Sequence, residues 1–386
     1  MLKIKAVVAL YLSFWARCVL RIRKPLIVGV TGSVGKTTTT EMIAAVLARP
    51  YSEALLGRVR KPVSAKSMNN DFGLPFAVLL SEDPFAGSTW YSRAAELCAI
   101  PFRAVFLAFW PQYPRVLVLE YGAGWSGHLH RLASLAPPTV AVVTTIGPAH
   151  LERLRTLEGV AREKSALVRA APPTGLVVLG DNHGFVSDLE RLSAAPVIKV
   201  TGRGVELSRN IARAIGRHFG LPDQEINAAF DEFKMPRGRL NRTEFAGLTI
   251  IDDTFNANPL SMRLGLDTLA ATAASGQRRV AILGGMGELG DDSAKYHEEI
   301  AAYARERCDV LIGVGELARP YAADRWFSDS AACAKEVGQL LHPGDCVLVK
   351  GSASVRMARI VRELRKTDRT ELPRASETPP RELLEA

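Results

Sequence analysis

Cysteine is scarce in this chain and does not cluster. The 386 residues hold five cysteines, and no two of them form a C-x-x-C pair. An odd number of scattered thiols is typical of reduced cysteines. It argues against a disulfide framework and against a zinc site built from cysteine pairs. We therefore expect the chain to work in a cytoplasmic compartment.

The N-terminal region lacks an apolar run long enough to cross a membrane. The run at residues 6–16 is much shorter than the roughly 20 residues that a spanning helix needs. No small-residue cleavage site separates it from the apolar strand expected at 26–30, which argues against a secretory signal. The composition, 47% hydrophobic and 23% charged, is that of a soluble globular protein of two or three domains.

Residues 1–24 contain no acidic side chain. Their basic residues are Lys3, Lys5, Arg17, Arg21, Arg23 and Lys24. Basic residues on both sides of an apolar run predict a basic amphipathic helix, packed either on the protein itself or peripherally on the anionic inner face of a membrane. The formal charge of the chain is +9. No nucleic-acid recognition motif accompanies that charge, so we expect no nucleic-acid partner.

A second apolar segment spans residues 94–113 and is interrupted by Pro101 and Arg103. It has two interpretations, a core helix or a second membrane-contacting helix beside the N-terminal one.

Apolar strand-like runs alternate with helical stretches along most of the chain. The runs fall at residues 26–30, 116–120, 139–144, 175–179, 197–201, 249–252, 279–283, 309–314 and 345–349. This alternation predicts an α/β fold with mainly parallel sheets. We expect a central domain over 25–240 and a C-terminal domain over 241–366, with a hinge in 235–247. A disordered tail is expected over 367–386.

The most informative motif is the glycine-rich turn that follows the first strand. Residues 27–47 read as strand, turn and helix, the arrangement that cradles a nucleotide triphosphate. The candidate phosphate-binding residues are Thr31, Gly32, Ser33, Gly35, Lys36, Thr37 and Thr38. Lys36 can reach the terminal phosphates, and the Thr37 hydroxyl can hold Mg²⁺. Val30 stands where the strict motif has glycine, so a glycine-containing turn with a chance lysine is the alternative.

Three later segments place polar residues at strand ends. Glu120 ends a buried strand, where it can complete the coordination of Mg²⁺ with Thr37. His150 follows the next strand, and Lys164 lies on the helix after it. In 250–269, carboxylates such as Asp253 can bind ribose hydroxyls and amide side chains can contact a base. An ordinary strand-end glutamate and an ordinary βα loop are the alternatives.

Together these segments resemble the Mur ligases, ATP-dependent amide-bond ligases of cell-wall synthesis. The matching motifs, from residue 26 to about 365, are TGSVGKTTT (31–39), NNDFGLP (69–75), VLEYGAG (118–124), IGPAHLERLRTLEGVAREK (146–164), GRL (238–240), DDTFNANPLSM (252–262), GGMGELGDDSAKYH (284–297) and VKGSASVRM (349–357). The resemblance is strongest to the MurF type, which joins D-Ala-D-Ala to a muramoyl tripeptide.

The resemblance implies a set of site residues. Lys36, Glu120, His150, Lys164 and Arg239 would act in catalysis. Two Mg²⁺ ions would be held by Thr37, Glu120, His150 and Lys164, with Lys164 carbamylated. Asn256 would contact the adenine. The substrates would meet Asn69, Asn70, Asn258, Lys350 and Ser352.

The implied reaction is ATP-dependent ligation through an acyl phosphate, in a monomeric enzyme. Metal ions, Lys36 and Arg239 would offset the repulsion between two anionic reactants. Two other interpretations stay open: a ligase for another pair, such as a polyglutamate- or capsule-forming enzyme, and a membrane-tethered nucleotide-binding partner protein.

The sequence departs from the family pattern in several places. The family's N-terminal UDP-binding domain has no counterpart before the first strand, and the middle domain is shortened, with Asn210 alone left of a His-Asn turn. Gly285 stands where the MurF type commonly has Asp, and Asn241 where many Mur ligases have Glu. None of these changes removes a phosphate or metal ligand, but how a UDP or lipid carrier is held is left open.

Overall fold

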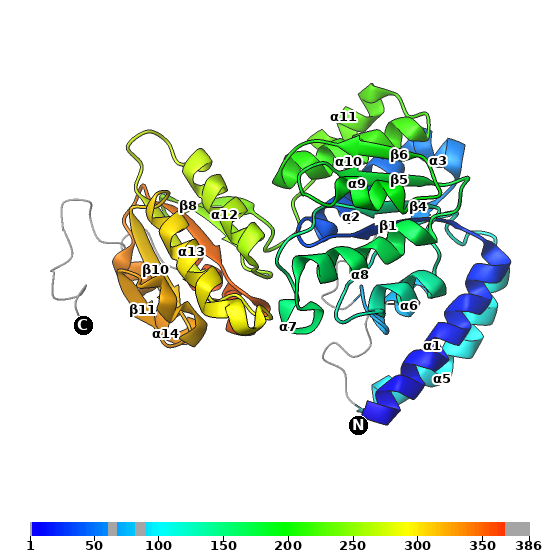
Figure 1. Ribbon diagram of the computed structural model, residues 1–386, viewed down its shortest axis with the longest axis horizontal. Helices are drawn as coiled ribbons and strands as arrows, with labels where there is room; N and C mark the ends of the chain where they lie inside the picture. The colour runs from blue at the N-terminus through cyan, green and yellow to red at the C-terminus, as the bar shows by residue number, and fades with distance from the viewer. Residues whose placement is uncertain (1, 61–67, 82–89, 367–386) are drawn as a thin grey trace. The chain divides into compact units, whose positions relative to one another are not determined.

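The computed structural model describes residues 2–60, 68–81 and 90–366 (Figure 1). The chain forms two compact units. The first comprises Met1–Gly147 and Thr156–Lys234, and the second Pro148–Arg155 and Met235–Ala386. The predicted tail at 367–386 lies outside the described residues.

A six-stranded parallel sheet forms the centre of the first unit. Its strands, in spatial order, are β2 (Val59–Arg60), β3 (Val116–Glu120), β1 (Leu26–Thr31), β4 (Val140–Val143), β5 (Leu176–Gly180) and β6 (Val197–Val200). The strands next to β1 are β3 on one side and β4 on the other, so connections diverge from its carboxyl end. Open α/β sheets bind their ligands at such a switch point.

Helices flank this sheet. They are α2 (Lys36–Leu47), α3 (Pro50–Leu56), α4 (Gly73–Val78), α6 (His128–Leu135), α8 (Leu157–Ala170), α9 (Val186–Arg191), α10 (Gly204–His218) and α11 (Asp223–Asp231). Of these, α2, α4, α8 and α10 pack on its strands, whereas α6 packs on α8 and α11 packs on α2 and α10. Residues Val116–Leu119 and Val140–Val143 are buried, as expected of parallel strands covered on both faces.

Two long helices of the first unit, α1 (Leu2–Arg23) and α5 (Trp90–Phe109), pack side by side (Figure 1). Pro101 lies inside α5 and has no N–H, so the Leu97 carbonyl four residues earlier loses its helical donor. The Tyr11 hydroxyl of α1 donates a hydrogen bond to that carbonyl at 2.9 Å. The proline that would weaken α5 thus creates the acceptor that ties α1 to it.

The second unit contains another six-stranded sheet, in which an edge strand runs antiparallel to its neighbour. In spatial order the strands are β11 (Arg325–Phe327), β10 (Val310–Val314), β9 (Arg279–Gly284), β12 (Cys346–Lys350), β8 (Leu248–Asp253) and β7 (Asn241–Phe245). β7 falls within the predicted hinge. Its polar residues were not expected to form a strand, yet an edge strand tolerates them.

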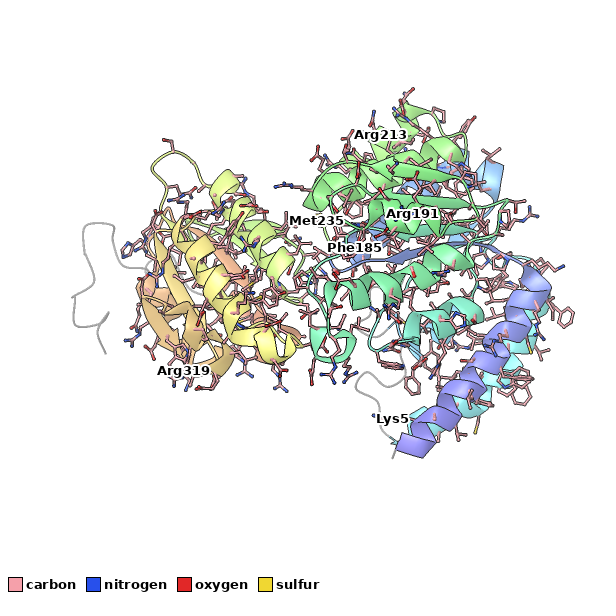
Figure 2. The ribbon with its side chains drawn as sticks, in the orientation of Figure 1. Lys5, Phe185, Arg191, Arg213, Met235 and Arg319 are labelled. Atoms are coloured by element: carbon pink, nitrogen blue, oxygen red, sulfur yellow. The ribbon has the colours of Figure 1, made fainter. Side chains whose placement is uncertain are left out.

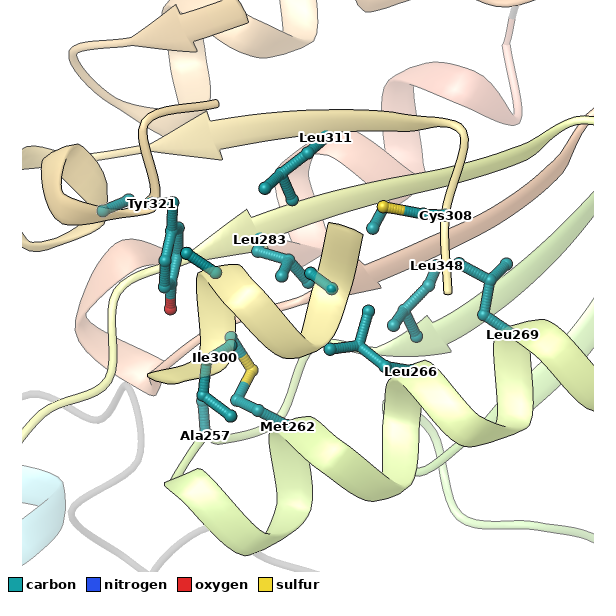
Figure 3. Close-up of a cluster of buried hydrophobic side chains, with 14 of the residues drawn as sticks. Ala257, Met262, Leu266, Leu269, Leu283, Ile300, Cys308, Leu311, Tyr321 and Leu348 are labelled. Carbon is teal, nitrogen blue, oxygen red and sulfur yellow. The ribbon is translucent and has the colours of Figure 1, made fainter. Parts of the chain in front are cut away.

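The helices of the second unit close two apolar cores, one on each face of its sheet. They are α7 (Leu151–Leu154), α12 (Pro259–Thr272), α13 (Ser293–Arg305), α14 (Ser330–Leu340) and α15 (Ala358–Leu364), with the 3₁₀ turns η1 (Gly290–Asp292), η2 (Glu316–Tyr321) and η3 (Ala353–Val355). In one core, Leu266 of α12 packs among Leu283, Ile300 and Leu348 (Figure 3). Each unit therefore has a core of its own.

The predicted α/β fold class is confirmed, and all nine expected strands are present to within one or two residues at each end. The two-residue β2, the antiparallel β7 and the short β11 were missed. None of the described helices combines the length and apolarity that crossing a bilayer requires. The predicted domain boundary at 240 stays a prediction.

Candidate functional site

The turn between β1 and α2 has the backbone of a phosphate-binding loop. Gly32 has a φ of 152°, and a Cβ built there would lie 1.9 Å from Oγ1 of Thr144, so any other residue would collide. Gly35 has a φ of 84° and caps α2. The loop therefore delivers the N-terminus of α2 to the carboxyl edge of the sheet, where backbone N–H groups and the helix dipole favour an anion.

The segment after β4 braces this loop. The Ser33 amide donates to the Thr145 carbonyl at 2.8 Å, and the Ser33 hydroxyl donates to the Gly147 carbonyl at 2.9 Å. Thr144 donates to the carbonyl of Val34 at 2.6 Å. A loop fixed on its outer side needs little reorganisation to receive an anion.

The basic and hydroxyl side chains of the motif lie at the end of β1 and at the start of α2. Nζ of Lys36 donates to the carbonyl of Gly32 at 2.7 Å, so its ammonium group lies across the loop. Thr38 is buried, and the Thr31 hydroxyl donates to the Tyr121 carbonyl at 2.9 Å. Thr31 and Thr38 are thus buried beside the loop.

The structure brings three predicted residues together next to this loop. Oε2 of Glu120 accepts a hydrogen bond from the Thr37 hydroxyl at 2.8 Å, and Oε1 accepts one from Nδ2 of Asn69 at 2.8 Å. Glu120 is placed by the register of the sheet, because it pairs with Val30 at the end of β1. Sequence positions 37, 69 and 120 therefore meet at one point.

The oxygen atoms of Thr37 and Glu120 suit Mg²⁺. This ion takes one or two protein oxygen ligands, and water and phosphate oxygens complete its octahedron. No group of three or more His, Cys, Asp or Glu side chains able to hold a metal occurs in the described part of the chain. The donors present thus fit an ion held jointly with a nucleotide and do not form a cage of their own.

Lys164 lies in the same unit and is 1% exposed. Burial lowers the pKa of its ammonium group well below the ordinary 10.5, and the positive charge of Lys36 lowers it further; Glu163 opposes the shift. A lysine in such surroundings favours its neutral amine, and a neutral amine is the form that can take up CO₂ as a carbamate.

His150 belongs to the second unit in the structure. Its Nδ1 lies 2.5 Å from Oε2 of Glu288, and this hydrogen bond to His150 lowers the pKa of the Glu288 carboxyl. The backbone N–H of Glu152 also donates to the carbonyl of Glu288. The turn at His150, which has a φ of 56°, is thereby fixed to the loop after β9.

Asp253 and Lys350 form a buried ion pair in the second unit. Nζ of Lys350 donates to Oδ2 of Asp253 at 2.6 Å and to the carbonyl of Asn256 at 2.9 Å. Asp253 was expected to bind ribose hydroxyls; in the structure its carboxylate is paired with Lys350. The Asn256 side chain itself is exposed.

Two predicted substrate residues hold backbone in place. Oδ1 of Asn70 accepts from the N–H groups of Phe72 and Gly73, both at 3.0 Å. Asn258 caps α12 through a reciprocal pair of hydrogen bonds with Ser261. These contacts give both residues a structural role, and contact with substrate stays a prediction for them.

Arg239 and Ser352 lie in the second unit. The Arg239 guanidinium lies 3.8 Å from the ring centre of Phe255, a cation–π contact that fixes its direction. The Ser352 hydroxyl lies 3.0 Å from that of Ser354. A Cβ at Gly285 would lie 2.4 Å from Cβ of Leu317, which explains why this chain has no Asp at 285.

A cluster of side chains next to Asn69 was not predicted from the sequence. Oδ1 of Asp71 accepts from Arg131 at 2.7 Å, and Oδ2 lies 3.6 Å from Nε2 of the buried His128. Trp125 stacks on His128 with ring centres 3.8 Å apart. Glu163 was also missed: it accepts from the N–H groups of Gly127 and Leu129 and so holds the start of α6. The one available signal was Asp71 within the NNDFG motif.

Family models match residues in both units of the chain. A family model described as the Mur ligase middle domain matches residues 30–85 and 97–215, and the model of the Mur ligase glutamate ligase domain matches 238–353. The UDP-N-acetylmuramoyl-tripeptide–D-alanyl-D-alanine ligase of Mycobacterium tuberculosis is 30% identical over 395 residues, which cover 84% of this chain and 70% of that protein.

Solved structures agree on the fold. The MurF ligase of Thermotoga maritima in complex with ADP has a TM-score of 0.74 at 23% identity, covering 93% of this chain and 83% of its own. A bifunctional folylpolyglutamate synthase/dihydrofolate synthase, bound to Mn, AMPPNP and L-glutamate, has a TM-score of 0.59 at 19% identity. The match covers 90% of this chain and 93% of that protein.

Proposed function

The chain belongs to the Mur ligase family of ATP-dependent carbon–nitrogen ligases, and from that premise we propose that it joins D-Ala-D-Ala to a muramoyl tripeptide. The amide would form through an acyl phosphate. The product would be a precursor of peptidoglycan.

The observation that carries this proposal is the contact of Glu120 with Thr37 and Asn69, beside the Lys36 loop. A carboxylate and a hydroxyl 2.8 Å apart at the end of a phosphate loop match the needs of a metal-bound triphosphate. Asn69 holds the carboxylate in place through its second oxygen, so the position of Glu120 is set from both sides.

The reaction begins when the acceptor carboxylate attacks the γ-phosphorus of ATP and ADP leaves. Both reactants are anionic, and Lys36, whose Nζ lies across the loop, offsets part of their repulsion. Mg²⁺ bound at Thr37 and Glu120 would supply further charge neutralisation. A carbamate on Lys164 would make this buried residue an anion able to help hold a second metal ion.

The amine of D-Ala-D-Ala then attacks the acyl carbon, an amide bond forms, and inorganic phosphate leaves. We assign Arg239 to the phosphates and Asn256 to the adenine. Lys350, held by Asp253, and Ser352 are assigned to the side of the incoming amine. His150 would add a metal ligand through Nε2, with its ring oriented by the contact of Nδ1 with Glu288.

The test is phosphate release from ATP by the full-length protein. Release that requires both D-Ala-D-Ala and a UDP-muramoyl tripeptide is the expected result. Lys36→Ala should lower turnover by roughly 10²-fold or more, because it removes a charge that stabilises the transition state. Lys199→Ala is the matched control, since Lys199 is a surface lysine paired with Glu190 and should leave turnover unchanged.

A second candidate is a ligase that adds glutamate. The folylpolyglutamate synthase structure favours it, because the aligned region covers nearly all of both chains. Release that depends on L-glutamate and a different acid, and not on D-Ala-D-Ala, would select this candidate and reject the first.

A further inference from the structure

Within 94–109, the part of α5 whose side chains the structure describes, none of the exposed residues is charged. Its exposed residues recur at helical spacing and are Ala94, Ala95, Cys98, Ala99, Phe102, Val105, Phe106 and Phe109. Phe102 is 80% exposed and Phe109 is 73% exposed. Soluble proteins rarely leave three phenylalanines uncovered on one face of a helix.

α1, which packs beside α5, has an apolar exposed stripe that becomes basic towards its C-terminal end. Val7, Leu10 and Phe14 are exposed, and the same stripe continues with Arg17 and Arg21. The opposite face of the helix is buried through Ala9, Leu12, Ala16 and Val19. The exposed apolar residues are therefore not needed to hold α1 on its own protein.

Positive charge accompanies these stripes. α1 carries five basic residues, one of which is the exposed Lys5 (Figure 2), and it carries no acidic residue. The acidic residue of α5, Glu96, lies 3.8 Å from Arg103 and accepts a hydrogen bond from Ser81. Its charge is thus taken up locally and does not oppose the cations of α1.

We propose that α1 and α5 form a docking face for the surface of an anionic phospholipid bilayer. Exposed phenylalanines would enter the boundary between headgroups and acyl chains, and the basic residues of α1 would pair with lipid phosphates. The attachment is peripheral, since no described helix can cross a bilayer. This inference is independent of the proposed ligation.

Charge decides between a bilayer and a second copy of the chain. In a two-fold dimer the same surface lies on both sides of the interface, so the basic stripe of α1 would approach its own copy. Like charges would then oppose association, whereas an anionic bilayer attracts them. The combination of aromatic and basic residues therefore favours lipid.

The test is co-sedimentation of the full-length protein with vesicles. We expect binding to phosphatidylcholine vesicles that contain about 30 mol% phosphatidylglycerol, and weak binding to phosphatidylcholine alone. Raising the salt to about 1 M, where the Debye length is about 3 Å, should release much of the protein.

Two pairs of variants separate the apolar and basic contributions. Phe102→Ser with Phe106→Ser should weaken binding about tenfold or more, whereas Tyr51→Ser with Leu55→Ser, exposed residues of α3, should not. Arg17→Gln with Arg21→Gln should weaken it about 25-fold, at about fivefold for each basic residue. Arg362→Gln with Arg365→Gln is the control for charge.

All variants change exposed side chains, so unaltered circular dichroism and ATP turnover would show that they fold. Absence of binding to anionic vesicles overturns the proposal, as does equal binding by the phenylalanine variant and its control. A concentration-dependent dimer in light scattering that the Phe102→Ser, Phe106→Ser variant abolishes, without vesicle binding, would assign the face to a second copy.

Discussion

Lys164 has surroundings that differ strongly from those of an exposed lysine. Its pKa is lowered first by burial and then by Lys36. In the unfolded chain the same amine titrates at its ordinary value of 10.5. At pH values between the lowered pKa of the folded state and 10.5, the unfolded state therefore binds more protons than the folded state. The stability of the protein rises with pH over this range.

We expect Lys164→Met to remove this dependence. At neutral pH the variant should melt at a higher temperature than the wild type, because an apolar side chain avoids the cost of burying an amine. The difference should shrink as the pH approaches 10. Thermal melts in CO₂-depleted buffer without nucleotide measure it, and a difference that stays constant with pH would contradict the burial argument.

Glu120→Gln tests the metal assignment at the same scale. The amide oxygen can still accept from Thr37, and Asn69 can turn its side-chain amide to accept from the new NH₂, so the fold should persist, but the charge that attracts Mg²⁺ is lost. We expect the Mg²⁺ concentration for half-maximal turnover to rise by about tenfold or more. Unchanged Mg²⁺ dependence would remove Glu120 from the site, and Glu190→Gln serves as the surface control.

At the scale of elements, the turn after β1 and the position of Glu120 could be predicted from the sequence. The turn is continuous in the chain, and the carboxyl ends of parallel strands meet at one edge. The contacts of Asp71 with His128 and of His150 with Glu288 could not, because they depend on how loops far apart in sequence pack. Pro101 shows the same limit. The sequence predicts that this proline interrupts a helix, but it does not predict that the Tyr11 hydroxyl donates to the Leu97 carbonyl that the proline leaves without a helical donor.

Tyr11→Phe should destabilise the first unit by about 1 kcal/mol, because the Leu97 carbonyl loses its donor. Pro101→Ala returns an N–H to that carbonyl. The cost of Tyr11→Phe should therefore fall in a Pro101→Ala background, as a double-mutant cycle in urea would show. An equal cost in both backgrounds would mean that the proline and the tyrosine are not coupled.

At the scale of the whole molecule, each unit has its own buried core. Unfolding should then occur in more than one step. Leu266→Ala, in the core of the second unit, should cost about 2–5 kcal/mol and lower one calorimetric transition. Tyr11→Phe should lower the other transition. A common shift of the whole curve by either variant would show a single cooperative unit.

The hydrogen bond from Tyr11 to Leu97 spans 86 residues of sequence. A ribosome adds roughly 5–20 residues each second, so the first helix leaves the exit tunnel several seconds before its partner is synthesised. Its apolar side has no intramolecular cover during that interval. Nascent chains should therefore be recognised by chaperones or by lipid early in translation, before α5 is synthesised.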